Sequence, residues 1–287
     1  MMEIKFHCDE ECNFHKGYGV RAFTYTYYSI EMHSHDFYEV NIVFAGSGTH
    51  CIKNREIRVC RGDVFVIPPM VPHAYTDTNG LEVYHILLQK SFLDRNKAES
   101  EQVRGFLQLT EIEPFLRGSA SNASGNFYLR LSYTQLMELN GELSFIDELS
   151  PFSWEECSAM KYHATWKILY WLSELLNRQI NSAKDAPKMK YEMQILGALE
   201  YIHNNYGEKI TIDDICREVY LSRSTFLRAF RSVCGIPPME YLNSYRCRKA
   251  LEQLGSSGCS KTETAHSCGF FDLSHMQRML KKHGLTL

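Results

Sequence analysis

The segment from Ser222 to Arg231 limits most strictly what this chain can fold into. Its pattern predicts a short helix that starts at the capping residue Ser222 and buries Phe226 and Phe230, four positions apart, on one face. A shorter helix capped by Thr211 precedes it, and only a tight turn separates the two. Taken alone, a helix with exposed arginines is more often solvated surface than a functional face. Helix, tight turn and helix in this order instead indicate a helix-turn-helix unit, whose second helix lies in the major groove of DNA.

A second and weaker copy of this pattern follows at the end of the chain. Gly235 ends the first unit, and one long helix separates it from a short helix that begins near Ser260. Asp272 then caps a last helix. The expected boundaries are 211–233 for the first unit, 260–283 for the second, and 191–287 for the all-α domain that holds both.

The charge of the chain is distributed unevenly. The net charge of −3 divides into +4 over residues 188–287 and −7 over residues 1–187. A basic last third favours contact with a polyanion such as DNA, whereas the acidic remainder does not. Because the excess of positive charge is modest, it supports nucleic-acid binding only together with the helix-turn-helix motif.

The first half of the chain has the pattern of a small all-β domain. Short runs rich in β-branched and aromatic residues follow one another from Val20 to Leu88. Turn residues such as Gly46–Gly48 and Asn79–Gly80 punctuate these runs. Six or more short strands at this spacing predict a closed sandwich or barrel. The expected fold class is therefore α+β, with a β-barrel at 1–130 followed by helices.

Helical patterns follow the barrel. Apolar residues recur every three or four positions over 131–149, and a second helix carries apolar residues on more than one face. One side of this helix can pack on the barrel, and the other needs either the preceding helix or a second subunit. We interpret this pair of helices, 131–180, as a dimerisation element. Residues 181–190 have no periodicity and one proline, so we expect a linker there.

Four residues of the β-rich half stand out by type and spacing: His33, His35, Glu39 and His73. They occur as His-x-His-x3-Glu, followed by a glycine, and as a later Gly-x5-Pro-x4-His. Together these segments resemble both signature motifs of the cupin family, a small jelly-roll barrel. The resemblance implies that the four side chains converge inside the barrel, where metal-binding cupins hold one ion. Imidazole and carboxylate ligands suit zinc, iron, nickel or manganese.

Three interpretations of these four residues stay open. They could hold a metal in an enzyme such as a dioxygenase or isomerase. They could instead line a pocket for a small-molecule effector, with or without a metal. In the third interpretation each is a structural residue with local hydrogen bonds. The second motif is also imperfect, because Met70 stands where glycine is preferred and Asp77 where asparagine is preferred.

The last third of the chain resembles the DNA-binding domain of AraC/XylS-type transcription regulators. The matching residues are Leu221, Ser222, Phe226, Arg228, Ala229, Phe230, Gly235, Tyr241, Leu242, Arg246, Ala250, Ala265, Gly269, Phe270, Asp272, Ser274 and Arg278. A cupin-like barrel and a helical pair ahead of this domain are typical of sugar-responsive members, so the resemblance covers nearly the whole chain. It implies a regulator that binds double-stranded DNA, responds to a sugar or related metabolite in the barrel, forms a homodimer, could contact RNA polymerase, and performs no catalysis.

The resemblance also implies which residues contact DNA. The base-contacting positions are Ser224, Leu227 and Arg228 on the first recognition helix and Leu273, Ser274, Gln277 and Arg278 on the second. Of these, the arginines could contact guanine or phosphate and the glutamine could pair with adenine. The positions better suited to phosphate are Arg223, Arg231, Lys281 and Lys282.

Several residues depart from the family pattern. Tyr220 stands where the first turn usually has glycine, so we expect a strained left-handed residue there. In the second unit, Met276 and Leu280 replace the usual bulky aromatics, and the sequence stops at Leu287, before the usual proline and tail. These departures favour the first unit as the main contributor to base recognition.

The remaining features concern compartment and cofactors. The N-terminus lacks an apolar run long enough for a signal peptide, and no stretch of about 18 apolar residues predicts a membrane span. The ten cysteines follow no regular frame, which indicates reduced thiols in a cytoplasmic protein. We expect no required cofactor. The alternative function is a metal-dependent cupin enzyme or a metal-sensing regulator that uses His33, His35, Glu39 and His73.

Overall fold

A computed structural model gives the fold of the chain. It describes residues 4–6, 20–27, 29–52, 55–100, 102–103, 105–118, 128–148, 154–182, 190–256, 259–283 and 285. The chain divides into two compact units, one ending at residue 183 and the other beginning at residue 184. Most of the expected linker at 181–190 lies outside the described residues; Asn181 and Ser182 belong to the last turn of a helix.

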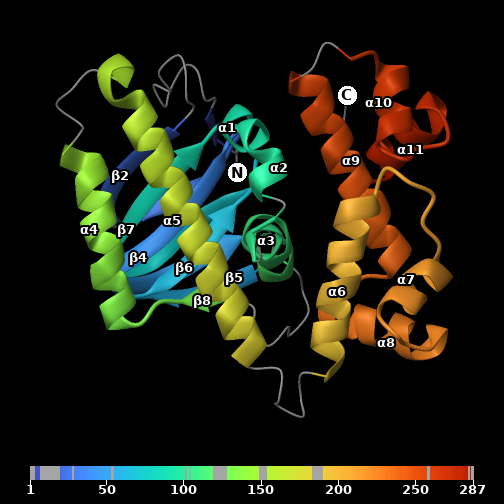
Figure 1. Cartoon of the computed structure of the whole chain (residues 1–287), viewed down its shortest axis with the longest axis horizontal. Helices are drawn as coiled ribbons and strands as arrows, with labels where there is room; N and C mark the ends of the chain where they lie inside the picture. The colour runs from blue at the N-terminus through green and yellow to red at the C-terminus, as the bar shows by residue number, and fades with distance from the viewer. Residues whose placement is uncertain are drawn as a thin grey trace. The chain divides into compact units, whose positions relative to one another are not determined.

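The strands are β1 (Ile4–Phe6), β2 (Val20–Tyr27), β3 (Ile30–His35), β4 (Tyr38–Ile52), β5 (Arg55–Cys60), β6 (Asp63–Ile67), β7 (His73–Leu88) and β8 (Leu129–Arg130). The helices of the first unit are α1 (Lys90–Arg95), α2 (Lys97–Ser100), the π-helix η1 (Gln108–Ile112), α3 (Glu113–Arg117), α4 (Tyr133–Glu148) and α5 (Trp154–Ser182). The helices of the second unit are α6 (Lys190–Asn205), α7 (Ile212–Glu218), α8 (Arg223–Cys234), α9 (Pro238–Ser256), α10 (Lys261–Ser267) and α11 (Leu273–Lys282) (Figure 1).

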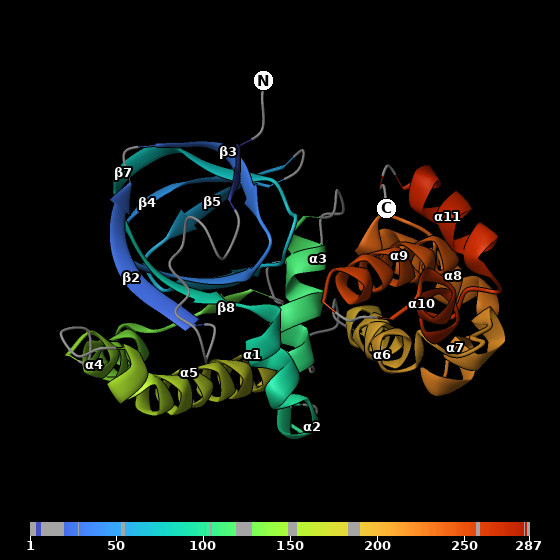
Figure 2. The same ribbon diagram turned by 90° about the horizontal axis from the view of Figure 1, so that it is seen from above.

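The strands form one sheet that curls into a barrel, as Figure 2 shows in a view along its opening. The strand order is β1-β3-β7-β4-β6-β8, with β2 beside β7 and β5 beside β4. The long strands β4 and β7 pair antiparallel along most of their length, in the middle of the strand order. The α+β fold class, with a β-barrel ahead of an all-α unit, is confirmed.

The prediction that glycines separate short strands was wrong at two places. Gly46–Gly48 and Asn79–Gly80 lie inside β4 and β7, which run through them without a turn. The β4–β7 register shifts three times between Val43 and Thr49, and such bulges let a strand bend instead of ending. A Cβ atom on Gly46 would lie 2.0 Å from the carbonyl oxygen of Gly80, so glycine here permits a close backbone approach.

The barrel interior has an apolar part and a polar part. Seven fully buried residues fill the apolar part: Val43, Val59, Phe65, Ile67, Tyr75, Leu81 and Val83. Along β4, side chains alternate between the two faces of the sheet, so Glu39 and Asn41 lie on the same inner face as Val43. The inner face of one strand therefore changes from apolar to polar within four residues.

The helix pair α4 and α5 covers one side of the barrel (Figure 2). Helix α5 contacts β2, β8, η1 and α4, and it buries apolar residues on both sides. On one side Trp166 stacks on Phe92, with ring centroids 4.8 Å apart. The chain itself therefore covers both apolar sides of α5, and no second subunit is needed for that purpose. Larger exposed apolar side chains lie on α4 instead, at Tyr133, Met137 and Phe145.

The second unit consists of two helix pairs, α7–α8 and α10–α11, joined by the long helix α9. The predicted caps are confirmed at Thr211, whose side chain forms a capping box with Asp214, and at Ser222 and Asp272. Gly235 ends α8 in the left-handed conformation, with φ +78°. These local signals fix where each helix begins and ends.

A buried arginine ties the second helix pair to α6. Arg246 on α9 donates hydrogen bonds from Nε to the carbonyl of Tyr206 (2.7 Å) and from Nη2 to the carbonyl of Glu208 (2.6 Å). Gly269, in the turn between α10 and α11, packs against the same place; a Cβ atom there would lie 2.5 Å from the Tyr206 oxygen. The end of α6, α9 and the second turn thus form one packed junction.

Candidate functional sites

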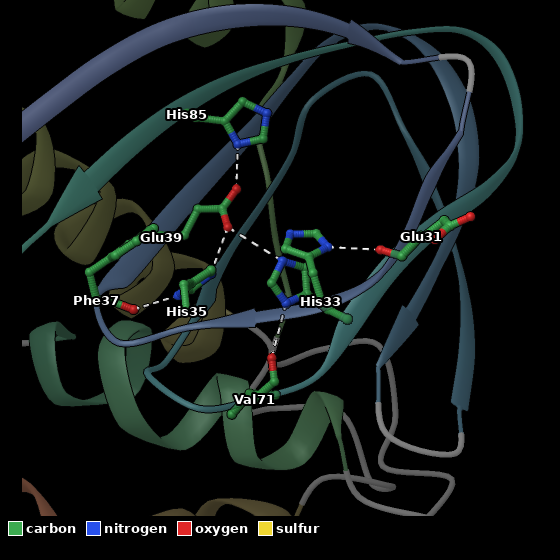
Figure 3. A network of polar contacts seen from close by, with 8 residues as sticks. Glu31, His33, His35, Phe37, Glu39, Val71 and His85 are labelled. Atoms are coloured by element: carbon green, nitrogen blue, oxygen red, sulfur yellow. Dashed lines mark hydrogen bonds and ion pairs between the residues drawn. The ribbon is translucent and has the colours of Figure 1, made fainter. Parts of the chain in front are cut away.

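The first candidate site is a cluster of histidines around Glu39 inside the barrel (Figure 3). Strand β3 supplies His33 and His35, β4 supplies Glu39, and the first residue of β7 is His73. All four side chains are buried, each at most 7% exposed. The structure thus brings together the four residues that the sequence singled out.

Backbone carbonyl groups fix how three of these imidazole rings are oriented. Nδ1 of His33 donates to the carbonyl of Glu31 (2.9 Å), Nδ1 of His35 to that of Phe37 (2.8 Å), and Nδ1 of His73 to that of Val71 (3.0 Å). Since a carbonyl oxygen only accepts, each Nδ1 carries a proton. The neutral form of each ring therefore has its lone pair on Nε2.

The Glu39 carboxylate is the centre of the cluster. Its Oε2 lies 2.8 Å from Nε2 of His35 and 3.4 Å from Nε2 of His73, while its Oε1 lies 2.5 Å from Nδ1 of His85. Burial by itself would raise the pKa of Glu39, but the imidazoles of His35, His73 and His85 around the carboxylate outweigh burial and hold this pKa well below its usual value. Glu39 is therefore an anion inside the barrel.

A carboxylate that faces imidazole lone pairs needs a positive charge between them. A proton on Nε2 of His35 would supply it, because His35 would then donate from both ring nitrogens as an imidazolium. A divalent cation would also supply it. The candidate ligand atoms of His35, Glu39 and His73 all lie within 4.8 Å of one another, and imidazole with carboxylate is a donor set that suits zinc, iron, nickel or manganese. The residues present therefore fit a metal ion.

Other imidazoles of the cluster are held neutral. Burial, and then the neighbouring His73, lower the pKa of His33 to about 4. Burial, and then the charge of Arg117, lower the pKa of His50 well below its usual value. His50 lies on the inner face of β4, with its ring centroid 6.1 Å from that of His73. The cluster thus combines one anion with several uncharged donors and acceptors.

Three functional candidates of the barrel were missed from the sequence: Asn41, His50 and His85. Their signal was available, because a polar residue on the inner face of a buried strand is unusual. Asn41 lies two residues after Glu39, and His85 interrupts an apolar run in β7. Neither residue belongs to the His-x-His-x3-Glu segment or to the later Gly-x5-Pro-x4-His segment, so the motifs do not indicate them.

The second candidate site is the exposed face of the two recognition helices, α8 and α11. Six of the seven expected base-contacting residues are exposed to solvent: Ser224, Leu227, Arg228, Ser274, Gln277 and Arg278. The seventh, Leu273, is half-buried and packs against the core of the second helix pair. The opposite face of α8 buries Phe226 and Phe230, whose rings meet edge to face at 5.5 Å.

The cations expected at phosphates lie around the same helices. Arg231, Lys281 and Lys282 are exposed, and none of them forms an ion pair with a described residue. Arg223 is exposed too, but its Nη1 lies 2.8 Å from the carboxylate of Asp213 on α7. An exposed pair of this kind contributes about 1 kcal/mol or less, so a phosphate could replace the carboxylate.

Two family models match the chain, one in each unit. A model described as an AraC-like ligand binding domain matches residues 19–139, and a model described as a helix-turn-helix domain matches residues 215–284. The first match lies in the unit that holds the barrel, and the second lies in the helical unit. The chain is a DNA-binding transcription regulator of the AraC family, with an effector-binding domain ahead of its helix-turn-helix domain.

The chain is similar to curated relatives over most of their length. The chain is 26% identical to the HTH-type transcriptional activator RhaS of Pectobacterium carotovorum, over 87% of this chain and 83% of the relative. It is 23% identical to RhaS of Escherichia coli over the same shares. Among solved structures, ToxT from Vibrio cholerae covers 92% of this chain and 93% of its own, at 12% identity and a TM-score of 0.38. The two RhaS relatives are transcriptional activators by name.

Among the residues that the structure describes, none of the helices combines the length and the apolar character that a membrane span requires.

Proposed function

We propose that this regulator binds a small-molecule effector at the polar part of its barrel and reads DNA with α8 and α11. The carrying observation for the effector site is the buried polar cluster inside the barrel, in which His35, His73 and His85 surround the Glu39 carboxylate. A sugar or related metabolite is the proposed effector class, because hydroxyl groups match such a set. The proposed division is a barrel at 1–130, a helical pair at 131–180, a linker at 181–190 and a DNA-binding domain at 191–287.

Effector control would act through a shift between populations of the regulator. An effector that binds one conformation more tightly favours that conformation, and DNA affinity changes by the same coupling free energy. We propose a homodimer, so that two DNA-binding domains occupy paired half-sites. The exposed apolar residues of α4 support this proposal better than α5 does. We also propose RNA polymerase as a partner, and we propose no catalytic activity. The proposed compartment is the cytoplasm, because the regulator acts on DNA.

The base-contacting role of α8 can be tested at Arg228, which is exposed and forms no ion pair with a described residue. We expect Arg228→Ala to weaken binding to a DNA site selected from a random pool by about 1–3 kcal/mol, and to relax preference at one base position. Fluorescence anisotropy on single-base variants of the site measures both effects.

The matched control is Arg178→Ala, which removes an exposed arginine from α5 in the other unit. It should leave DNA binding unchanged. An Arg228→Ala protein with the same affinity and the same base preference as the parent would remove this residue from the base-contacting set.

A second candidate function is metal binding at His35, Glu39 and His73, favoured by the convergence of their ligand atoms. The ion would supply positive charge between the carboxylate and the imidazole nitrogens, and the three backbone carbonyl groups would orient the rings. Elemental analysis of the purified protein, with titration of Zn²⁺ and Ni²⁺ by calorimetry, tests it. We expect His73→Ala to abolish binding of either ion. Protein free of metal that ignores both ions would exclude this function.

A further inference from the structure

Two side chains inside the barrel each leave two buried polar atoms without a hydrogen-bond partner among the described residues. They are Asn41, at both its amide nitrogen and its carbonyl oxygen, and His50, at both ring nitrogens. Both side chains are 0% exposed. A folded protein seldom leaves a buried polar group unsatisfied, because the group loses its bonds to water and gains none in exchange. Two such residues in one barrel point to a missing partner.

Asn41 and His50 share the inner face of the barrel with the Glu39 cluster. Asn41 pairs in register with Phe65 on one side and with His85 on the other. The ring of Phe65 also stacks on His50, with centroids 4.7 Å apart. Phe65 therefore links the two unsatisfied side chains, and His85 joins Asn41 to Glu39.

A buried cation lies near the same place. The guanidinium of Arg117, on α3, is positioned over the ring of Phe65 at 4.3 Å and over that of Tyr128 at 4.6 Å. Its charge is already balanced, because its Nε donates to Oε1 of Glu113 at 2.6 Å. The site thus has aromatic walls, a compensated ion pair and two neutral polar side chains, without a spare positive charge for an anionic ligand.

The donors and acceptors of the two side chains define the chemistry of the partner. The Asn41 amide offers N–H donors and a carbonyl acceptor, and the neutral imidazole of His50 offers one of each. A carboxylate only accepts, so it would leave the acceptors of both residues unsatisfied. A hydroxyl group donates and accepts, and several adjacent hydroxyl groups satisfy both residues at once.

We propose that Asn41 and His50 are the residues that recognise the effector, and that the effector is a neutral polyhydroxylated compound with adjacent hydroxyl groups. This inference rests on the proposed effector-binding function of the barrel. It extends that function to two residues outside the histidine motif and assigns them the hydrogen bonds that decide specificity. The Glu39 cluster then borders the same ligand through His73 and His85.

The test begins with a thermal-shift screen of the full-length protein. The panel contains neutral aldopentoses, aldohexoses and deoxyhexoses, their acid derivatives with one carboxylate, and Zn²⁺ alone. We expect a neutral sugar to raise the melting temperature, while its acid derivative has a smaller effect. Calorimetry then gives the Kd of the best neutral sugar.

The decisive variants are Asn41→Leu and His50→Leu, which remove the unsatisfied groups and keep apolar bulk. Because an orphaned polar group is lost, each variant should melt at the same temperature as the parent or higher when no sugar is present. Each should also weaken sugar binding by about tenfold or more, the loss of one or more hydrogen bonds to the ligand. Asn140→Leu and His163→Leu, at exposed positions of α4 and α5, are the matched controls and should change neither value.

Three outcomes would overturn the inference. The first is a panel in which only acids or Zn²⁺ shift the melting temperature, or in which nothing does. The second is an unchanged Kd in both variants. The third is a melting temperature several degrees lower in both variants without sugar, since the two groups would then already be hydrogen-bonded inside the protein. DNA binding, measured separately on a selected site, distinguishes these failures from failure of the proposed regulator function.

Discussion

At the scale of single residues, burial decides the charge state of the barrel cluster. His33 is 7% exposed, and its pKa is lowered to about 4, mainly by burial. Glu39 stays ionised in the same interior because the imidazoles of His35, His73 and His85 surround its carboxylate and lower its pKa. Both groups therefore have a pKa in the folded protein that differs from their pKa in water. Because the unfolded chain has the ordinary values, the stability of the folded protein depends on pH.

The first prediction concerns that dependence. Between about pH 6.5 and pH 4 the unfolded chain binds a proton at His33 and the folded protein does not, so stability falls as the pH is lowered. His33→Gln should remove this contribution, which is about 3 kcal/mol at most. Urea unfolding of the full chain at pH 7 and at pH 4.5 measures the difference. Equal pH dependence in parent and variant would show that His33 does not titrate as stated.

The residues of the barrel cluster could be predicted from the sequence only where they belong to a motif. The resemblance of the segments around His33, His35, Glu39 and His73 to the two cupin motifs implied that all four side chains converge. His85 lies 46 positions from Glu39, and only the pairing of β4 with β7 brings the two together. No local pattern contains that information.

At the scale of helices and turns, the first helix-turn-helix contains a strained residue. Tyr220 lies between α7 and α8 with φ +54°, and its side chain is 91% exposed. The sequence predicted this strain from the absence of the usual glycine, and the structure confirms it. An L-residue in the left-handed region costs about 1–2 kcal/mol, and the exposed ring has little packing to offset that cost.

The second prediction is that Tyr220→Gly stabilises the protein by about 0.5–1 kcal/mol, since relief of strain exceeds the added entropy of glycine in the unfolded chain. The expected rise in melting temperature is measured by calorimetry. Tyr220→Ala is the control: it removes the ring but keeps the Cβ atom, so it should give no gain. A gain in both variants would mean that the exposed ring, rather than the backbone, is the cause.

Helix positions were easier to predict than strand positions. Thr211, Ser222 and Asp272 were identified as caps, and each accepts the expected backbone hydrogen bond within three residues. The glycines of β4 and β7 predict ends of strands in the sequence, whereas in the structure both strands bend and continue. A cap depends on neighbours in the sequence, whereas a bulge depends on the partner strand.

At the scale of the whole molecule, the chain separates into an acidic unit and a basic unit. The boundary between the compact units lies at residues 183 and 184, close to the point where the charge changes sign. Such a division lets each unit keep its own core, and the described parts of both units have one.

The third prediction is that residues 184–287 fold and bind DNA on their own, with an affinity that falls steeply between 50 and 200 mM salt, because cations displaced from phosphates are released on binding. Calorimetric unfolding and anisotropy at a series of salt concentrations provide the measurements. Residues 1–183 should melt cooperatively and should not bind the same DNA. If the fragment 184–287 bound DNA only weakly, with an affinity that did not depend on salt, the prediction would be contradicted.

The sequence by itself determined the order of the units, the helix boundaries of the DNA-binding domain and the face of α8 that carries Arg228. These features depend on contacts between residues three or four apart, so their pattern is written along the chain. The tertiary structure alone decided that α5 is covered on both sides and that Asn41, His50 and His85 join the Glu39 cluster. Closing a barrel brings distant strands into register, and it is this long-range pairing that determines which buried polar groups meet and which still need a partner.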